Sequence, residues 1–315
     1  MIEDLGHGVH CTDTGYLRPG LAASFLVQDG DETAIIETGT PRSVGRILKA
    51  MSLAGVAPES VRWIIPTHVH LDHAGGAGAL LAHCPNARML VHPQGLRHMT
   101  DPARLVAGAV AVYGQSMFDQ LYGTVVAASP ERVLAADDGS AWALGSRLLR
   151  ITDTPGHARH HFCVWDEASA GWFTGDTFGV AYQELYTAGR PFLMPTTTPV
   201  QFDPEALHRS IDTLMAASPS RFYLTHFGLL ENAPGLADEL RADIDGYVRL
   251  CCDTPQGPEA EADLITRLTA HTVAQLRTRG CRWRRAALER FIRFDMDLNA
   301  PGLLGWQARQ APSPR

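Results

Sequence analysis

The chain has 315 residues, enough to bury a sizeable core as one large α/β domain with an appendage or as two modest domains. Hydrophobic residues make up 45% and charged residues 19%, a composition typical of folded globular proteins that argues against disorder as the main state. The formal net charge of -7 argues against binding of nucleic acid through the overall electrostatic field.

Short apolar runs and helical spacing alternate through the first hundred residues. They predict strands at residues 23–28, 33–37, 61–65 and 88–92, and helices at 41–55 and 77–83. Asp29-Gly30-Asp31 between the first two strands is typical of a tight β-hairpin turn. The strand at 61–65 leads directly into a cluster of histidines, so these side chains are expected where a strand ends and a loop begins.

The second part of the chain continues with strands and then becomes helical. The pattern over 102–122 is helical but interrupted by Gly108 and Gly114, and strands are predicted at 133–135, 148–152, 162–165, 171–174 and 221–224. A Pro-rich and Thr-rich loop at 178–202 is long enough to act as a lid. Asp203 is a plausible cap for a following helix. Beyond Pro234 several helices are expected.

The cysteines and the chain start indicate the compartment. The six cysteines form no CxxC pair, so reduced thiols are expected. The N-terminus has no basic start or long apolar stretch, and no segment reaches the roughly 18 apolar residues of a membrane span. We therefore expect a cytoplasmic protein without membrane contact. Lys49 is the only lysine, and this arginine bias suggests the genome composition of a GC-rich bacterium.

The run THVHLDH at residues 67–73 has the residue types of a metal site. His68 and His70 lie two residues apart in extended chain and project from the same side, and Asp72 and His73 follow around the turn. Imidazole and carboxylate groups suit zinc and neighbouring first-row metals. Four such side chains in six residues exceed what one tetrahedral ion would take from one loop, which suggests two ions.

Three later residues share this setting at the end of an apolar strand beside small residues. They are His157 in DTPGH, Asp176 in FTGDT and His226 in LTH. Each alone is more often a hydrogen-bonded loop residue. Together with the first cluster they supply enough ligands for two metal ions.

These motifs, in this order, resemble the metallo-β-lactamase superfamily over about residues 23–228. The resemblance implies an α+β four-layer αβ/βα sandwich at residues 1–232, followed by a C-terminal helical region at 233–315. It further implies that one metal ion is held by His68, His70 and His157, a second by Asp72, His73 and His226, and that Asp176 bridges both. Two divalent ions per chain are expected, zinc first, with iron or manganese as alternatives.

Within the superfamily, TPGHARHH at 154–161 resembles the TPGHTPGH motif of the glyoxalase II branch. His161 matches the second, non-ligand histidine of that motif. Arg159 and His160 replace Pro-Gly, and Glu37 stands where that branch usually has Asp. Neither departure changes an expected ligand.

The implied chemistry is hydrolysis by a metal-bridging hydroxide. Two divalent ions, two carboxylates and one hydroxide leave the cluster positive by about one charge, which attracts an anionic small-molecule substrate. Asp72 is the expected catalytic residue, orienting the nucleophile and carrying its proton. A thioester is favoured over another ester or a lactone. The Arg-rich stretch at 277–293 suits an anionic carrier such as glutathione or coenzyme A, or alternatively a solvated face or homodimer contact.

Other functions fit the same ligands. Similar folds serve as mononuclear-iron persulfide dioxygenases, and the motif does not separate these from hydrolases. A nucleic-acid-processing nuclease ranks third, because only about fifty residues separate Asp176 from His226. A metal-bound sensor without catalysis is a further alternative. Tyr113, Tyr182, Tyr186 and Arg190 lie in segments that could cover the site, but no substrate-binding residue is predicted.

Overall fold

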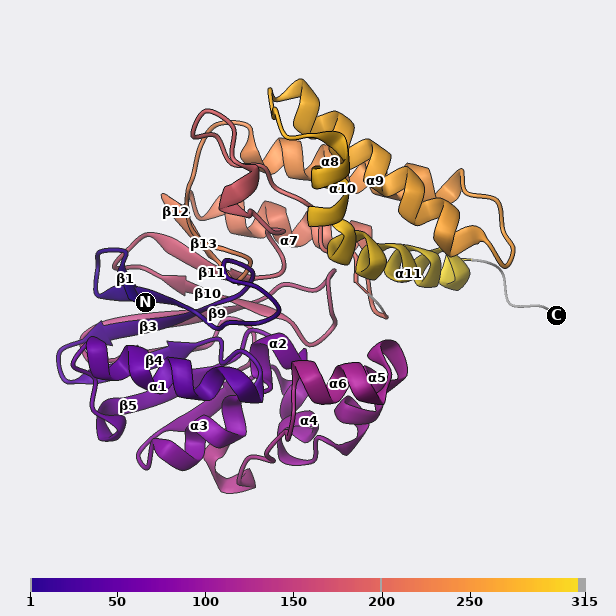
Figure 1. Cartoon of the computed structure of the whole chain (residues 1–315). Coiled ribbons are helices and arrows are strands. Elements are labelled where there is room, and N and C mark those ends of the chain that lie inside the picture. The colour runs from indigo at the N-terminus through magenta and orange to yellow at the C-terminus, as the bar shows by residue number, and fades with distance from the viewer. Residues whose placement is uncertain (1, 199, 311–315) are drawn as a thin grey trace. The chain divides into compact units, whose positions relative to one another are not determined.

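The computed structural model describes residues 2–198 and 200–310, and the chain divides into two compact units. One contains the residues up to Asp153 together with His160–Gly175 and Ser218–Asn232, and we call it the sheet unit. The other contains Thr154–Arg159, Asp176–Ala217 and the chain from Ala233 onward, and we call it the helical unit (Figure 1). The domain boundary between residues 232 and 233 stays a prediction.

The first sheet of the sheet unit has seven strands in chain order. They are β1 (Ile2–Asp4), β2 (Val9–Asp13), β3 (Ala23–Asp29), β4 (Glu32–Ile36), β5 (Val61–Ile65), β6 (Arg88–Val91) and β7 (Val133–Ala135). The pairs from β1 to β4 are antiparallel and those from β4 to β7 are parallel. Asp29 pairs with Glu32, so Gly30 and Asp31 form the tight turn predicted between β3 and β4.

The second sheet is also mixed and has six strands in the order β13-β12-β11-β10-β9-β8. They are β8 (Ala141–Leu144), β9 (Arg147–Asp153), β10 (Phe162–Asp166), β11 (Gly171–Gly175), β12 (Arg221–Leu224) and β13 (Gly228–Glu231). β11 and β12 pair in parallel and the other neighbours pair antiparallel. The parallel pair places the chain just after β11 and the chain just after β12 at one edge of the sheet.

Six α-helices lie among the described residues of the sheet unit, and two apolar layers hold it together. The helices are α1 (Val44–Leu53), α2 (Leu71–Ala74), α3 (Ala77–His83), α4 (Leu96–Thr100), α5 (Ala103–Tyr113) and α6 (Gln115–Leu121). Leu26 and Ile35 of the first sheet pack with Ile47 of α1 and Leu80 of α3. Alternate residues such as Phe25 point the other way, into a core shared with the second sheet.

The structure confirms the strands predicted from apolar runs and adds four. β1, β2, β8 and β13 were not predicted, because they are short or carry polar residues and so lack a clear alternation of apolar side chains. The predicted interruption at Gly108 is wrong, because α5 continues through it. A glycine inside a helix costs only about 1 kcal/mol relative to alanine. Gly114, with φ of 75°, does separate α5 from α6.

The helical unit contains five helices among the described residues. They are α7 (Pro204–Ala216), α8 (Leu236–Cys252), α9 (Ala260–Thr278), α10 (Arg285–Phe291) and α11 (Arg293–Gln310). The Asp203 side chain accepts from the backbone N–H of Ala206, which confirms the predicted cap of α7. Tyr247 of α8 hydrogen-bonds to Thr272 of α9 at 2.7 Å inside the helix packing. No helix in the described part is long and apolar enough to cross a membrane.

Candidate metal centre

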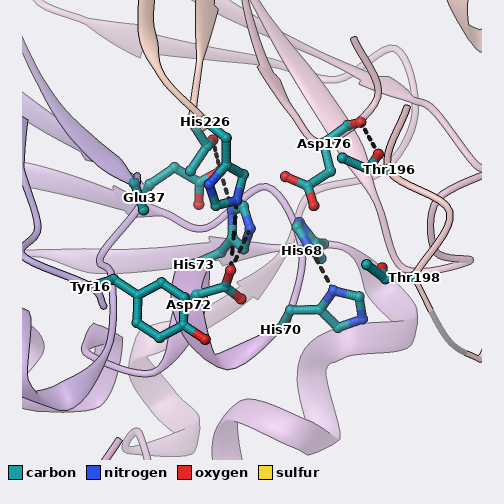
Figure 2. Close-up of polar contacts among 12 residues, drawn as sticks. Tyr16, Glu37, His68, His70, Asp72, His73, Asp176, Thr196, Thr198 and His226 are labelled. Carbon is teal, nitrogen blue, oxygen red and sulfur yellow. Dashed lines mark hydrogen bonds and ion pairs between the residues drawn. The ribbon is translucent and has the colours of Figure 1, made fainter. Parts of the chain in front are cut away.

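The THVHLDH run follows β5 in the sheet unit, and its last three residues, Leu71 to His73, belong to α2. The backbone carbonyl of Thr67 accepts from Phe162 N–H at 3.0 Å, which ties the start of the run to the second sheet. Nδ1 of His68 lies 3.1 Å from Thr67 Oγ1, and Nε2 of His68 lies 2.9 Å from Nδ1 of His70. The two imidazoles therefore turn one nitrogen each toward the same point (Figure 2).

Asp72, His73 and His226 form a second group in the same unit, in which three ligand-type atoms surround one point. Oδ2 of Asp72 lies 3.6 Å from Nε2 of His73 and 3.6 Å from Nε2 of His226 (Figure 2). Tetrahedral ligands at the usual bond lengths of about 2.0–2.2 Å lie about 3.3–3.6 Å apart. The spacing of these donors fits one metal ion.

The remaining ring nitrogens are held by groups behind the ligands. Nδ1 of His226 donates to the backbone carbonyl of Leu21 at 2.6 Å, and Nδ1 of His73 lies 3.2 Å from Glu37 Oε1. Such partners fix the tautomer of a metal-binding histidine and leave its other nitrogen for the metal. The tautomer set in this way leaves Nε2 of both histidines facing Asp72.

Glu37 is the residue that links these ligands from behind. Its side chain is 1% exposed, and it accepts from Thr67 Oγ1 at 2.5 Å and from Thr225 Oγ1 at 3.0 Å. Its backbone φ of 63° is uncommon for a residue other than glycine. The carboxylate thus contacts the residue before His68, the residue before His226 and the ring of His73. The sequence marked Glu37 only as a departure from the usual Asp, not as a contact of His73.

Gly175 at the end of β11 allows a close approach within the sheet unit. A Cβ at this position would lie 2.4 Å from Thr67 Oγ1 and 2.5 Å from Nε2 of His161, and φ is 49°. Only glycine fits there without displacing these side chains. His161 is buried, with its ring 4.8 Å from that of His68.

Two predicted ligands, His157 and Asp176, lie in the helical unit. Nε2 of His157 is 3.3 Å from Oδ2 of Asp176, and Nδ1 of His157 lies 3.3 Å from the carbonyl oxygen of Thr196. Thr196 Oγ1 donates to the backbone carbonyl of Asp176 at 2.7 Å (Figure 2). The structure therefore groups the seven predicted ligands as five in the sheet unit and two in the helical unit.

Three tyrosines gather near Asp72, and only one of them was weighed from the sequence. The hydroxyls of Tyr16 and Tyr122 lie 2.9 Å apart, and the ring of Tyr113 lies 5.8 Å from that of Tyr122. Burial, followed by the charge of Asp72, raises the pKa of the Tyr16 and Tyr113 phenols. No sequence motif pointed to Tyr16 or Tyr122, because the three residues come from distant segments.

Other side chains considered as covers for the site have partners in the helical unit. Tyr182 donates to Asp295 at 2.8 Å, and Arg190 pairs with Glu239. These contacts are internal to that unit. Tyr182 and Arg190 therefore have protein partners that explain their positions, and no bound substrate is needed to explain them.

Comparison with known proteins places these residues in a family. A family model described as the metallo-beta-lactamase superfamily matches residues 17–226. The metallo-beta-lactamase fold-containing protein ST1585 of Sulfurisphaera tokodaii is 25% identical over 245 residues, covering 74% of this chain and 82% of that protein. Its crystal structure matches with a TM-score of 0.60 and 23% identity, over 86% of this chain and 99% of that chain.

Two thioesterases are also similar, over shorter stretches. Thioesterase pkgB of Emericella nidulans is 30% identical over 52% of this chain and 40% of that protein. Acyl-coenzyme A thioesterase MBLAC2 of Bos taurus is 27% identical over 55% of this chain and 64% of that protein. The chain thus spans less than two thirds of either enzyme.

The matches decide the fold class and the family. The predicted class is confirmed as two mixed sheets flanked by helices, with C-terminal helices. The His and Asp clusters could hold metal ions, as the superfamily does. Because the family model covers 210 residues from 17 to 226, this chain belongs to the metallo-beta-lactamase superfamily.

Proposed function

We propose that this protein is a metal-dependent hydrolase that cleaves thioesters. The observation that carries the proposal is the arrangement of Asp72, His73 and His226, whose donor atoms are spaced for one ion. Membership of a superfamily made up mainly of metal-dependent hydrolases supports the reaction class.

The ligand assignment follows from the family order of the motifs. In this proposal His68, His70 and His157 hold one divalent ion, Asp72, His73 and His226 hold the second, and Asp176 bridges them. Zinc is the proposed ion. When bound, such ions activate water for attack and polarise the carbonyl of the substrate.

Asp72 is the proposed catalytic residue of the chain. Its side chain is 22% exposed, whereas those of His73 and His226 are 0% and 7% exposed. Oδ2 faces the two histidines, so the other carboxylate oxygen is the one that can orient a water and accept its proton. A carboxylate that is partly open to solvent can pass that proton on.

A thioester is the proposed substrate class for two reasons. The TPGHARHH segment resembles the glyoxalase II branch, and two similar proteins are thioesterases. An anionic carrier is proposed as the leaving group. In the Arg-rich stretch at 277–293, Arg277, Arg279, Arg285 and Arg293 donate to groups within the helical unit, and Arg282, Arg284 and Arg290 are exposed. In this proposal Arg282, Arg284 and Arg290 would bind the anionic carrier.

The test is activity against a panel of acyl-coenzyme A thioesters, N-acetylcysteamine thioesters, esters and lactones. We expect thioester hydrolysis that is lost on exhaustive chelation and restored by zinc, manganese or iron. Asp72→Asn and His226→Ala should lower kcat/KM by about a thousandfold or more, as loss of an activating group typically does. His208→Ala, which removes the pair between His208 of α7 and Asp245 of α8, is the matched control.

The same preparation separates the alternatives. If the protein contains a single iron ion per chain and consumes oxygen when glutathione persulfide is added, the function is that of a dioxygenase and not of a hydrolase. Cleavage of nucleic acid with no thioester hydrolysis would support a nuclease. Metal binding without turnover of any compound in the panel would support a metal-bound sensor without catalytic activity. Full thioesterase activity after complete removal of metal would refute the proposed mechanism.

A further inference from the structure

The phenols of Tyr16, Tyr113 and Tyr122 form a defined cluster, which we call the phenol cluster. Tyr16 and Tyr122 are 3% and 2% exposed, whereas Tyr113 is only half-buried. The rings of Tyr113 and Tyr122 lie 5.8 Å apart and those of Tyr16 and Tyr122 lie 5.9 Å apart. Tyr113 is therefore the side of the cluster that meets solvent.

The phenol cluster is coupled to the ligands through one loop. Tyr16 and Leu21 both lie in the segment between β2 and β3, and Leu21 holds the ring of His226. The side chain of Asp13 accepts from Gly15 N–H at 2.6 Å and from Gly20 N–H at 2.8 Å, so this segment is held at both ends. The position of Tyr16 relative to the ligands is thus set by the fold.

Helix α5 carries an apolar stripe that ends at the phenol cluster. No residue of α5 is fully buried, although its sequence ARLVAGAVAVY is strongly apolar. Val106, Ala109, Val110 and Tyr113 are all half-buried, at a spacing that puts them on one helix face. Leu105 beside them packs partly on the core, but the core cluster does not include the rest of the stripe.

We propose that the stripe Val106-Ala109-Val110 and the phenol cluster bind the apolar acyl group of the substrate. This rests on the proposed thioesterase function and specifies its substrate class. The acyl chain would lie along the stripe, and its carbonyl would accept from the phenol cluster beside Asp72. From residue 106 to 113 the helix rises about 10 Å, the length of roughly eight carbon atoms of extended chain.

Neutral phenols suit this position better than charged groups. Burial and the nearby Asp72 carboxylate raise the pKa of all three phenols, so they stay protonated and can donate near neutral pH. A ligand site is typically mostly apolar with a few placed donors that fix orientation. The stripe supplies the apolar part and the phenol cluster supplies the donors.

The experiment measures binding of straight-chain fatty acids from four to twelve carbons to the metal-free protein by calorimetry. We expect affinity to rise about twofold to fourfold per methylene up to roughly eight carbons and then to level off. Val106→Ser/Val110→Ser should flatten this dependence, with Val110→Ala as a milder variant should the double variant not fold. Tyr113→Phe should weaken all chains by about fivefold without changing the dependence, because it removes one hydrogen bond.

Two controls test whether these effects are specific. Tyr247→Phe removes a buried hydroxyl in the helical unit, and Leu53→Ser changes an apolar side chain on α1 that is 60% exposed. Both should bind fatty acids as the unaltered protein does. Affinity independent of chain length would refute the inference. So would a dimer that dissociates in Val106→Ser/Val110→Ser, since a second copy would then cover the stripe.

The experiments can reject the acyl site and the proposed thioesterase function independently of each other. Length-dependent fatty-acid binding in a protein that hydrolyses no thioester would reject the function and keep the acyl site. Thioester hydrolysis without length-dependent binding, with no change of acyl preference in Val106→Ser/Val110→Ser, would keep the function and reject the acyl site.

Discussion

Glu37 joins three parts of the chain through one buried carboxylate. Its two oxygens contact Thr67 after β5, Thr225 after β12 and the ring of His73 within α2. A buried carboxylate is costly unless it is hydrogen-bonded, and here several donors surround it. Its contact with His73 makes Glu37 part of the candidate metal centre, although it is not itself a predicted ligand.

We predict that Glu37→Gln lowers zinc affinity by about 10- to 100-fold. The amide keeps the shape of the side chain but loses the charge, and its NH₂ group cannot accept from His73 or Thr67. Competition with a chromophoric chelator measures the affinity. Glu205→Gln, at a side chain that is 88% exposed, should leave it unchanged. Equal zinc affinity in Glu37→Gln would contradict the role assigned to Glu37.

At the scale of elements, Arg132 closes the connection between α3 and β6. Its guanidinium donates to the backbone carbonyls of Leu81 at 2.9 Å, Cys84 at 2.5 Å and Ala87 at 2.6 Å. These carbonyls lie at and beyond the C-terminal end of α3, where helix carbonyls lack partners within the helix. Arg132 also stands directly before β7, so it joins a helix end to the edge of the first sheet.

Replacing this arginine should destabilise the sheet unit. Arg132→Met is expected to lower the free energy of unfolding by about 2 kcal/mol, because several carbonyls lose a charged donor at a half-buried position. Urea denaturation followed by circular dichroism measures the change. Arg209→Met, at a side chain that is 69% exposed and lies 4.0 Å from Glu205, should change stability by less than about 0.5 kcal/mol. Similar losses in both variants would refute the special role of Arg132.

At the scale of the whole molecule, the C-terminal helices support the residues around His157. Asn299 of α11 accepts from Thr197 N–H at 2.6 Å and donates to the carbonyl of Pro195 at 3.1 Å. Thr196 between them contacts both His157 and Asp176. A Cβ on Gly302 would lie 1.7 Å from the carbonyl oxygen of Thr197, so α11 packs directly on this segment. The lid role of 178–202 stays a prediction.

Asn299→Ala should therefore act on both stability and metal binding. We expect the free energy of unfolding to fall by about 2–3 kcal/mol, because the buried N–H of Thr197 and carbonyl of Pro195 lose their partner. Zinc affinity should fall as well, since Thr196 no longer holds His157 in place. Asn86→Ala, which removes an exposed hydrogen bond to Glu59, is the control. Unchanged zinc affinity in Asn299→Ala would show that α11 does not influence metal binding by His157.

Removal of metal should lower the stability of the whole protein. Ions that bind only the folded chain stabilise it by about 2.7 kcal/mol at a free concentration one hundred times the Kd. Chelation should accordingly reduce Tm by an amount on the order of 5 °C, and added zinc should restore it. Differential scanning calorimetry with and without chelator measures both steps. A Tm insensitive to chelator and to zinc would argue against resident metal ions.

The sequence alone determined the family, most strands and the candidate ligands. His68, His70, Asp72 and His73 stand in one short run, and the apolar strand at 61–65 leads directly into it, so local pattern was sufficient. Short polar strands such as β1 lacked that pattern. The assignment of all seven ligands to two ions, the cytoplasmic location and the homodimer remain predictions.

Only the tertiary structure decided the contacts that join distant segments. Glu37 meets Thr225 across 188 positions, and Tyr16 meets Tyr122 across 106. Such pairs leave no local signature, because neither residue has a spacing or neighbour that predicts the other. The residue types that suit a metal ion can be recognised directly in the sequence at 67–73. The groups that orient these side chains come from distant segments, and only the folded structure shows which strand ends lie together.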